Sequence, residues 1–395
     1  MREQTHDIWN DDDGEAAERQ AQKSRRRRFL IFFLVLAAVL LVVLVAAWRD
    51  GTGFDILRRT FSYQDQAAQG EAAYEYDASS QNRFAVLGDR LVVLSATKLQ
   101  ILDPVDGEIW SASVNMSAPA LVQSGDRAAA YDVGGTELYV LSEEGELLHL
   151  TAEETEPFLA ANLNEDGWLA VTAEKATYKG SVAVYDPELE KVFEFKSSQR
   201  FVTDACVTDN GRNLAAVTLG QEAGTFVSNV VIYDLSKKDP QAEYDVADGL
   251  VAAITDRDGQ LITVSDTCLT MAGVKGEVEA TYAYGGSYLR GYDLGGDGFV
   301  PLLLNRYRSG SVGRLVTVNE KGEELASLDV SEEVLDLSAA GRYLAVLYAD
   351  SLVVYNQDLE VYATYEGTDY ASGVLMRSDG SALLTSGESA SLFLP

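Results

Sequence analysis

The sequence predicts an all-β fold, an eight-bladed β-propeller of four-stranded antiparallel blades, preceded by one transmembrane α-helix. Three observations predict it. Residues 29–48 form an uninterrupted apolar run. Downstream, an apolar strand followed by a turn of Asp, Asn or Gly recurs eight times. The ends of the third strands recur at intervals of 37 to 48 residues, which is the period of a propeller blade.

These signals divide the chain into four parts. We expect residues 1–28 to form a disordered cytoplasmic tail, because they are polar, charged and without apolar periodicity. Residues 29–48 are the predicted transmembrane helix, 49–71 a juxtamembrane connector and 72–395 the extracytoplasmic propeller. The connector is interpreted either as a short amphipathic helix at the membrane surface or as a loose stalk.

The predicted span, FLIFFLVLAAVLLVVLVAAW, contains no charged residue. At about 1.5 Å per residue, a helix of this length covers the roughly 30 Å hydrocarbon core of a bilayer. A buried soluble helix would rarely lack polar residues over five turns. A cleaved signal peptide is the other alternative, since residues 45–47 resemble a cleavage site, but the apolar run is too long for a signal peptide. A retained anchor is favoured.

The orientation follows from basic residues on one side of the span. Arg25, Arg26, Arg27 and Arg28 precede it directly, whereas the far side is poor in basic residues. The positive-inside rule therefore places the N-terminus in the cytoplasm and the C-terminal domain outside, as in a single-pass cell-membrane protein. Trp48, at the outer end of the run, suits an interfacial anchor.

The charge of the chain restricts its partners. The 395 residues carry a formal net charge of −31, and residues 1–48 hold seven basic and seven acidic side chains. The excess negative charge therefore lies downstream. Such a surface repels nucleic acid and anionic lipid, and it suits basic proteins, cations or neutral ligands better.

The repeat itself consists of four strands. Its first turns are Gly88-Asp89, Gly125-Asp126, Asp166-Gly167, Asn210-Gly211, Asp258-Gly259, Asp297-Gly298, Ala340-Gly341 and Asp379-Gly380. The eighth unit ends after three strands, at Pro395. Residues 72–77, AAYEYD, have a strand-like pattern and precede the first complete unit, so we expect them to supply the missing fourth strand. Such closure removes two exposed sheet edges.

The units resemble those of known propellers. A strand, an Asp-Gly turn, a strand and a further strand ending in Tyr-Asp resemble WD-repeat blades, although the Trp-Asp and Gly-His pairs are absent. Residues 102–110, LDPVDGEIW, are similar to the repeat of quinoprotein-like propellers, which supports the architecture and not a cofactor. The whole plan resembles an uncharacterised family of bacterial membrane proteins with a domain of unknown function. This resemblance implies localisation, not activity.

No catalytic, cofactor or metal site is predicted, and no cofactor is expected. The two histidines, His6 and His149, belong to no His/Cys cluster. Ser95 and Lys98 match an S-x-x-K nucleophile motif, but they span a turn between strands, so the match is taken as coincidence. Cys206 and Cys268 are expected to be buried and free, although a disulfide outside the cytoplasm is conceivable.

Acidic residues in turns raise the question of calcium. Asp103, Asp106 and Glu108, and separately Asp293 and Asp297, are conceivable ligands. Turn chemistry, in which an Asp side chain bonds the local backbone, explains Asp at these positions more simply.

Three long connections depart from the repeat. They join the second and third strands of units three, four and six, at residues 174–180, 220–227 and 306–313. In a propeller all three emerge on the same face. They are either neutral insertions or a binding surface for an envelope protein or glycan. The candidate partner-binding residues are Tyr178, Lys179, Phe226, Arg306, Tyr307 and Arg308.

Two functions remain open from the sequence. A non-catalytic scaffold or sensor at the cell envelope, binding a protein or another ligand, is favoured because no reactive constellation is found. The alternative is an extracytoplasmic hydrolase or lyase that acts on a cell-wall polymer through carboxylates near the propeller axis. An inward-facing acid pair with separated pKa values would support the enzyme.

Overall fold

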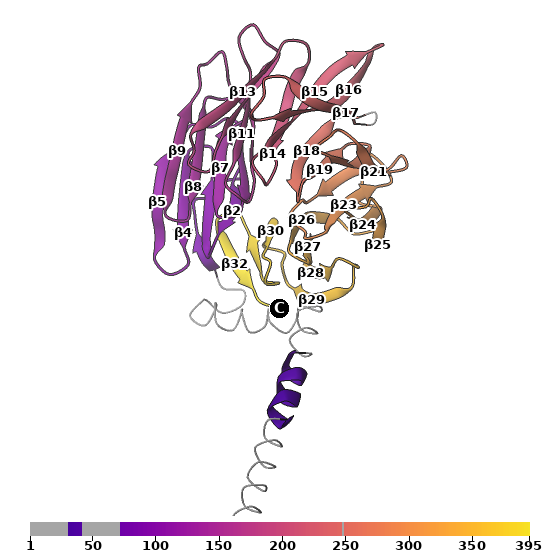
Figure 1. Cartoon of the computed structure of the whole chain (residues 1–395). Helices are drawn as coiled ribbons and strands as arrows, with labels where there is room; N and C mark the ends of the chain where they lie inside the picture. Colours follow the sequence, from indigo (N-terminus) through magenta and orange to yellow (C-terminus); the bar gives the residue numbers. More distant parts are fainter. Residues whose placement is uncertain (1–30, 42–71, 247–248) are drawn as a thin grey trace, which may run out of the picture. The chain divides into compact units, whose positions relative to one another are not determined.

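The computed structural model describes residues 31–41, 72–246 and 249–395 (Figure 1). The chain divides into two units, Met1–Gln64 and Asp65–Pro395. The predicted tail, the connector, the arginines at 25–28 and Trp48 lie outside the described residues.

Residues 31–41 of the predicted span are helical. Their large apolar side chains are between 44% and 69% exposed on every side of the helix. In the described part of the chain no helix is both long enough and apolar enough to cross a membrane. The rest of the predicted span lies outside the described residues, so the membrane helix stays a prediction.

The second unit contains eight four-stranded antiparallel sheets, as the repeat predicts. Blades 1 to 4 are β2 (Arg83–Leu87), β3 (Arg90–Leu94), β4 (Lys98–Asp103), β5 (Gly107–Ser113); β6 (Pro119–Ser124), β7 (Arg127–Asp132), β8 (Glu137–Ser142), β9 (Gly145–Thr151); β10 (Phe158–Leu163), β11 (Leu169–Ala173), β12 (Gly180–Tyr185), β13 (Lys191–Ser197); and β14 (Phe201–Val207), β15 (Asn213–Glu222), β16 (Thr225–Asp234), β17 (Pro240–Asp245).

Blades 5 to 8 are β18 (Val251–Arg257), β19 (Gln260–Ser265), β20 (Cys268–Gly273), β21 (Val278–Ala283); β22 (Tyr288–Tyr292), β23 (Phe299–Asn305), β24 (Gly313–Asn319), β25 (Glu324–Val330); β26 (Val334–Ala340), β27 (Tyr343–Tyr348), β28 (Ser351–Asn356), β29 (Val361–Glu366); and β30 (Gly373–Met376), β31 (Ala382–Thr385), β32 (Ser389–Phe393) with β1 (Ala72–Glu75). The predicted closure is therefore confirmed, since β1 pairs antiparallel with β32 and completes blade 8.

The core lies between the blades. Second strands such as β23 and β27 and the third strand β20 are buried on both faces, whereas fourth strands such as β21 alternate between exposed and half-buried side chains. Val92 and Leu94 of blade 1 belong to the same apolar cluster as Ala128 and Ala130 of blade 2. Each blade thus covers its neighbour, because a single twisted sheet cannot bury both of its faces alone.

The antiparallel order of the strands defines two rims. The turns from first to second strand and from third to fourth strand lie at one end of every blade, which we call the turn rim. The connections from second to third strand, and those from one blade to the next, lie at the other end, the loop rim. Strand β1 runs from the turn rim, at Ala72, to the loop rim, at Glu75.

Candidate functional site

The three long connections lie where the sequence predicts them. Residues 174–179 join β11 to β12, and residues 306–312 join β23 to β24. Residues 220–227 form the end of the hairpin β15–β16, whose strands are each ten residues long. All three connect second to third strands, so all three lie on the loop rim.

The β15–β16 hairpin is extended by its turn chemistry. Its register runs without interruption from Asn213↔Asp234 to Glu222↔Thr225. Ala223 and Gly224 form the turn with φ of 47° and 90°, the positive values that a two-residue hairpin turn requires. Figure 1 shows the long arrows of β15 and β16. The hairpin holds Phe226 near its tip, 59% exposed.

Lysines lie over aromatic rings within blade 3 and where blades 3 and 4 meet. Lys179 Nζ lies 4.6 Å from the ring centroid of Phe201, and Lys196 Nζ lies 5.9 Å from that of Tyr178. The rings of Tyr178 and Phe201 are 44% and 55% exposed. We call Tyr178, Lys179, Lys196 and Phe201 the cation–aromatic patch.

Sequence reasoning missed two members of this patch. Phe201 is the first residue of β14 and directly precedes the buried Val202, so in the sequence it looks like part of a core strand. Lys196 alternates along β13 with half-buried aromatic residues, which is typical of a solvated outer strand. The available signal was the position of both residues at strand ends on the loop rim.

The blade 6 loop presents a second group of cations. Arg306, Tyr307 and Arg308 are exposed, with Tyr307 at 62%. The loop is shaped by backbone contacts: the Arg306 N–H donates to Val312 O at 3.0 Å, and Asn305 Nδ2 donates to Gly310 O at 2.6 Å. Within the described residues neither arginine has an acidic partner.

The loop rim holds every exposed aromatic side chain of the described propeller. These six residues are Tyr178, Phe201, Phe226, Tyr288, Tyr307 and Tyr370. Tyr178, Tyr307 and Tyr370 come from connections, and Phe201 and Tyr288 are the first residues of the inner strands of blades 4 and 6. Phe226 lies near the tip of the β15–β16 hairpin. The exposed large apolar residues on the outer strands and the turn rim are all aliphatic. The loop rim is therefore the surface on which the exposed aromatic side chains of the described propeller gather.

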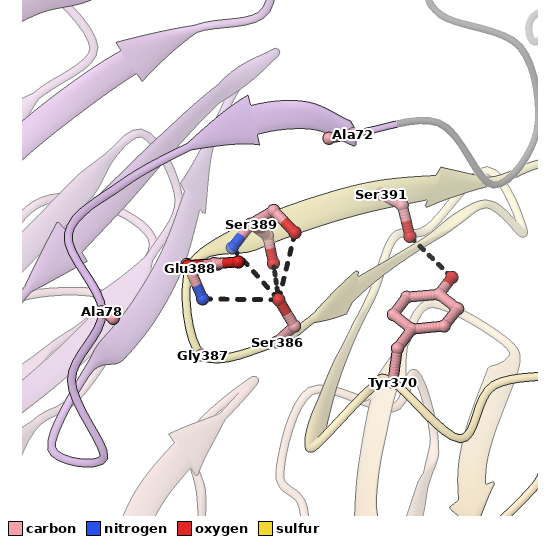
Figure 2. A pocket seen from close by; sticks show the side chains of 8 residues that line it. All are labelled: Ala72, Ala78, Tyr370, Ser386, Gly387, Glu388, Ser389 and Ser391. Carbon is pink, nitrogen blue, oxygen red and sulfur yellow. Dashed lines mark hydrogen bonds between the residues drawn. The ribbon is translucent and has the colours of Figure 1, made fainter.

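A polar recess of about 530 Å³ lies on the same rim at blade 8. It is bounded by β1, the β31–β32 turn and the connection before β30 (Figure 2). The hydroxyls of Tyr370 and Ser391 lie 2.8 Å apart, and Ser386 Oγ donates to Ser389 O at 3.0 Å. These side chains therefore satisfy one another, and the recess adds a shaped polar surface to the rim.

Carboxylates line the axis, where the alternative enzyme function would require them. Asp336 accepts the N–H groups of Leu337 and of Val374 in the next blade, each at 2.9 Å. Asp204 of β14 likewise accepts backbone N–H groups of Ala205 and of Ile254 in the next blade. The inner edge of each first strand carries unpaired N–H groups, so these acids join neighbouring blades by capping them.

Among Asp204, Asp293 and Asp336 no two form a pair with separated pKa values. Burial raises the pKa of Asp204 to about 7 and that of Asp293 to about 6, and it also raises the pKa of Asp336. The charge of Asp336 contributes to the shift at Asp293. All three pKa values move in the same direction for the same reason, so the geometry assigns these acids a structural role between blades.

The other residues considered for chemistry have local roles. Asp103 Oδ1 accepts the N–H groups of Val105 and Asp106 at 2.9 and 3.1 Å, the turn chemistry expected of it. Ser95 and Lys98 flank the turn between β3 and β4. Across the described ranges no group of three or more His, Cys, Asp or Glu side chains could hold a metal ion.

The two cysteines, Cys206 in β14 and Cys268 in β20, are both buried and free. This agrees with the favoured prediction. Cys268 Sγ lies 3.4 Å from Ser265 Oγ within blade 5. Burial raises the pKa of Cys206.

Solved structures with the same fold support the architecture. A computationally designed protein, Ika8, matches with a TM-score of 0.60 and 14% identity over 82% of this chain and 100% of its own. The C-terminal WD40 domain of Sif2 matches with a TM-score of 0.60 and 15% identity over 82% of this chain and 98% of its own. The quinohemoprotein alcohol dehydrogenase ADHIIG from Pseudomonas putida HK5 matches with a TM-score of 0.52 and 11% identity over 81% and 72%. At these identities the likeness concerns the fold alone.

No curated protein matches the chain by sequence. A family model does match, over residues 62–358, and it describes a family of unknown function, DUF5711. The match covers most of the propeller. The chain therefore belongs to the DUF5711 family.

Proposed function

We propose that this protein is a membrane-anchored, non-catalytic scaffold or sensor that binds a protein or another ligand of the cell envelope through its loop rim. The observation that carries the proposal is the gathering of all six exposed aromatic residues of the described propeller on that rim. Loops on a rigid scaffold commonly carry binding function, and aromatic and Arg residues dominate binding energy at interfaces.

The anchor is supported by the apolar run at 29–48 and by the exposure of the described helix. In the helix at 31–41, apolar side chains are exposed on every side, a surface that is stable in hydrocarbon and unfavourable in water. The basic residues that precede the run favour a cytoplasmic N-terminus. The propeller then stands outside the cytoplasm.

The axial carboxylates argue for binding over hydrolysis. A hydrolase or lyase needs one acid and one base whose oxygens can reach a substrate. Asp204 and Asp336 instead accept backbone N–H groups of adjacent blades. We therefore favour the scaffold over the hydrolase or lyase.

The test of the loop rim is a combined variant in whole cells. Tyr178→Ser, Phe226→Ser, Arg306→Ser and Tyr307→Ser, made together, change exposed side chains only, so the melting temperature should stay the same. Crosslinking followed by mass spectrometry should show loss of the proteins or glycans that the natural chain captures. The matched control changes exposed residues of the turn rim, Val105→Ser and Lys321→Ser, and should preserve capture. Unaltered capture by the loop-rim variant would sink the proposal.

The test of topology is protease protection in intact cells. We expect an epitope tag placed before residue 25 to be protected and the propeller to be accessible, with the chain remaining in the membrane fraction after alkaline carbonate extraction. Extraction of the intact chain into the soluble fraction would contradict the anchor.

A further inference from the structure

We propose that the polar recess at blade 8 binds a neutral saccharide unit. The recess has a volume of about 530 Å³, within the range of about 300–1,000 Å³ that is typical of small-ligand pockets. It lies on the loop rim, so this inference deepens the proposed function. It rests on the loop rim as the binding surface and names the class of ligand that one part of that rim recognises.

Hydroxyl groups from separate segments of the chain line the recess (Figure 2). Tyr370 comes from the connection between β29 and β30, and Ser391 comes from β32. Ser386 and Ser389 flank the turn between β31 and β32. Ser391 is 4% exposed, whereas Tyr370 is 42% exposed. The recess therefore has a buried hydroxyl beside an aromatic ring that solvent reaches.

The hydrogen bonds that these hydroxyls form with one another leave capacity for a ligand. A hydroxyl group has one donor and two acceptor positions. In the pair of Tyr370 and Ser391 one O–H donates to the other oxygen, and the second O–H has no acceptor among the described residues. Ser386 Oγ donates to Ser389 O at 3.0 Å, so in the 3.0 Å contact between the two serine hydroxyls Ser389 is the donor. The lone pairs of Ser389 Oγ stay open, and the recess offers both a donor and an acceptor.

The charge of the lining disfavours ionic ligands. Among the described residues that line the recess, Glu388 is acidic and none is basic. An anion would lack a cationic partner and would face this carboxylate. An ammonium group only donates hydrogen bonds, so it would leave the open O–H of the Tyr370–Ser391 pair without an acceptor. A neutral hydroxyl group both donates and accepts, and it therefore matches the recess.

The spacing of the hydroxyls and the Tyr370 ring suit one saccharide unit. Ser389 and Ser391 are two residues apart on β32, so their side chains lie on the same face of the strand, roughly 7 Å apart. Hydroxyls on opposite sides of one pyranose ring can bridge such a separation. The faces of a pyranose ring carry C–H groups, which can pack on the apolar face of Tyr370. One unit then makes the polar and the apolar contacts together.

The experiment uses the full chain in lipid nanodiscs and an array of short oligosaccharides. Neutral hexose and N-acetylhexosamine oligomers are compared with galacturonate oligomers, which are anionic, and with glucosamine oligomers, which are cationic. Calorimetry then gives the affinity of the strongest probe of each series. A neutral oligomer should bind at least about tenfold more tightly than either charged series. Its affinity should be the same at low and at high salt, because salt screens only interactions between charges.

The variants remove the ring, the hydroxyls or the space. Tyr370→Ala should weaken the neutral probe by about tenfold or more, since it removes both the ring and a hydroxyl. Tyr370→Phe with Ser391→Ala keeps the ring and should weaken the probe by roughly three- to tenfold. Ala78→Trp keeps every hydroxyl but fills the recess, and it should abolish binding. The matched control Tyr307→Ala removes an exposed tyrosine of the same rim outside the recess and should change nothing. Equal melting temperatures show that each variant is folded.

Each binding result decides the inference. No binding of any neutral oligomer, or binding that survives both Tyr370→Ala and Ala78→Trp, would overturn it. Tightest binding of the glucosamine series, with loss in Glu388→Gln, would assign the recess to an ammonium ligand instead. Cell-wall polysaccharide and glycoprotein from the same cells, offered as competitors, distinguish the two sources of a neutral saccharide. Competition by either supports the inference and names the source, and competition by neither would contradict it.

Capture in whole cells separates this inference from the proposed function. If the combined variant at Tyr178, Phe226, Arg306 and Tyr307 loses its partners while no saccharide binds the recess, the proposed function stands and this inference fails. If neither that variant nor Tyr370→Ala changes capture, and no saccharide binds, both fail.

Discussion

The axial carboxylate Asp204 should make the propeller more stable in mild acid than at neutral pH. Asp204 Oδ1 accepts the Ala205 N–H at 2.8 Å, and the Ile254 N–H of the next blade also donates to this carboxylate. Burial outweighs these two donors and raises the pKa from its ordinary 3.8 to about 7. The perturbation that isolates this effect is Asp204→Asn, which removes the titrating group and keeps the size of the side chain.

The sign follows from proton binding. Below about pH 4 the carboxyl is protonated in both the folded and the unfolded chain. Between about pH 4 and pH 7 the folded chain retains the proton and the unfolded chain has lost it. The free energy of unfolding therefore falls as the pH rises, and it levels off above about pH 7. At about 1.4 kcal/mol for each pH unit between the two pKa values, Asp204 accounts for roughly 4 kcal/mol across this range.

Urea unfolding of the natural chain and of Asp204→Asn, measured from about pH 4 to pH 8, tests the reasoning. The Asn variant should gain stability relative to the natural chain as the pH rises, by several kcal/mol in total. Asp358→Asn, at an exposed turn between β28 and β29, removes the same charge and should follow the natural chain at every pH. A constant difference between natural chain and Asp204→Asn over the whole range would refute a raised pKa at this position.

Three further outcomes are expected. Gly211→Ala should lower the free energy of unfolding by about 2 kcal/mol or more, because a Cβ at this φ of +63° would lie 2.3 Å from the Trp168 ring. Gly259→Ala, at a φ of +84° with no atom close to the added Cβ, should lower it by about 1 kcal/mol. Equal urea midpoints of the two variants would contradict this. Iodoacetamide should modify Cys206 and Cys268 only after unfolding, as followed by mass spectrometry, because both thiols are buried; rapid labelling of the native chain would disagree. A chain that starts immediately before β1 should fold like the complete propeller. A chain that also lacks β1 should have a lower melting temperature and should self-associate through the exposed edge of β32, which light scattering would detect. Identical behaviour of the two truncated chains would rule out a stabilising closure.

The sequence specified the propeller because its determinants are local. Each blade is a run of short apolar strands and turns rich in Asp, Asn and Gly, so the period and the count of eight can be read along the chain. The closure by β1 was also predictable, because residues 72–77 were the one strand-like segment without a unit and the last unit lacked one strand. The long connections were visible as excess length between the second and third strands.

The composition of the loop rim required the tertiary structure. That Phe201 faces solvent beside Lys179 depends on how blades 3 and 4 pack. That Lys196 of β13 lies over Tyr178 depends on how the β11–β12 connection folds against β13 within blade 3, and no local pattern encodes either contact. The sequence also did not predict the role of the axial acids. Asp204 in β14 has the pattern of any polar residue in an alternating strand, and its bond to the N–H of Ile254 forms only because the next blade packs against it. By itself the sequence determined the architecture and the acidic charge, since these depend on local pattern and on composition. The fold decided which side chains meet, because neighbours in different blades are brought together only when the eight sheets close into a ring.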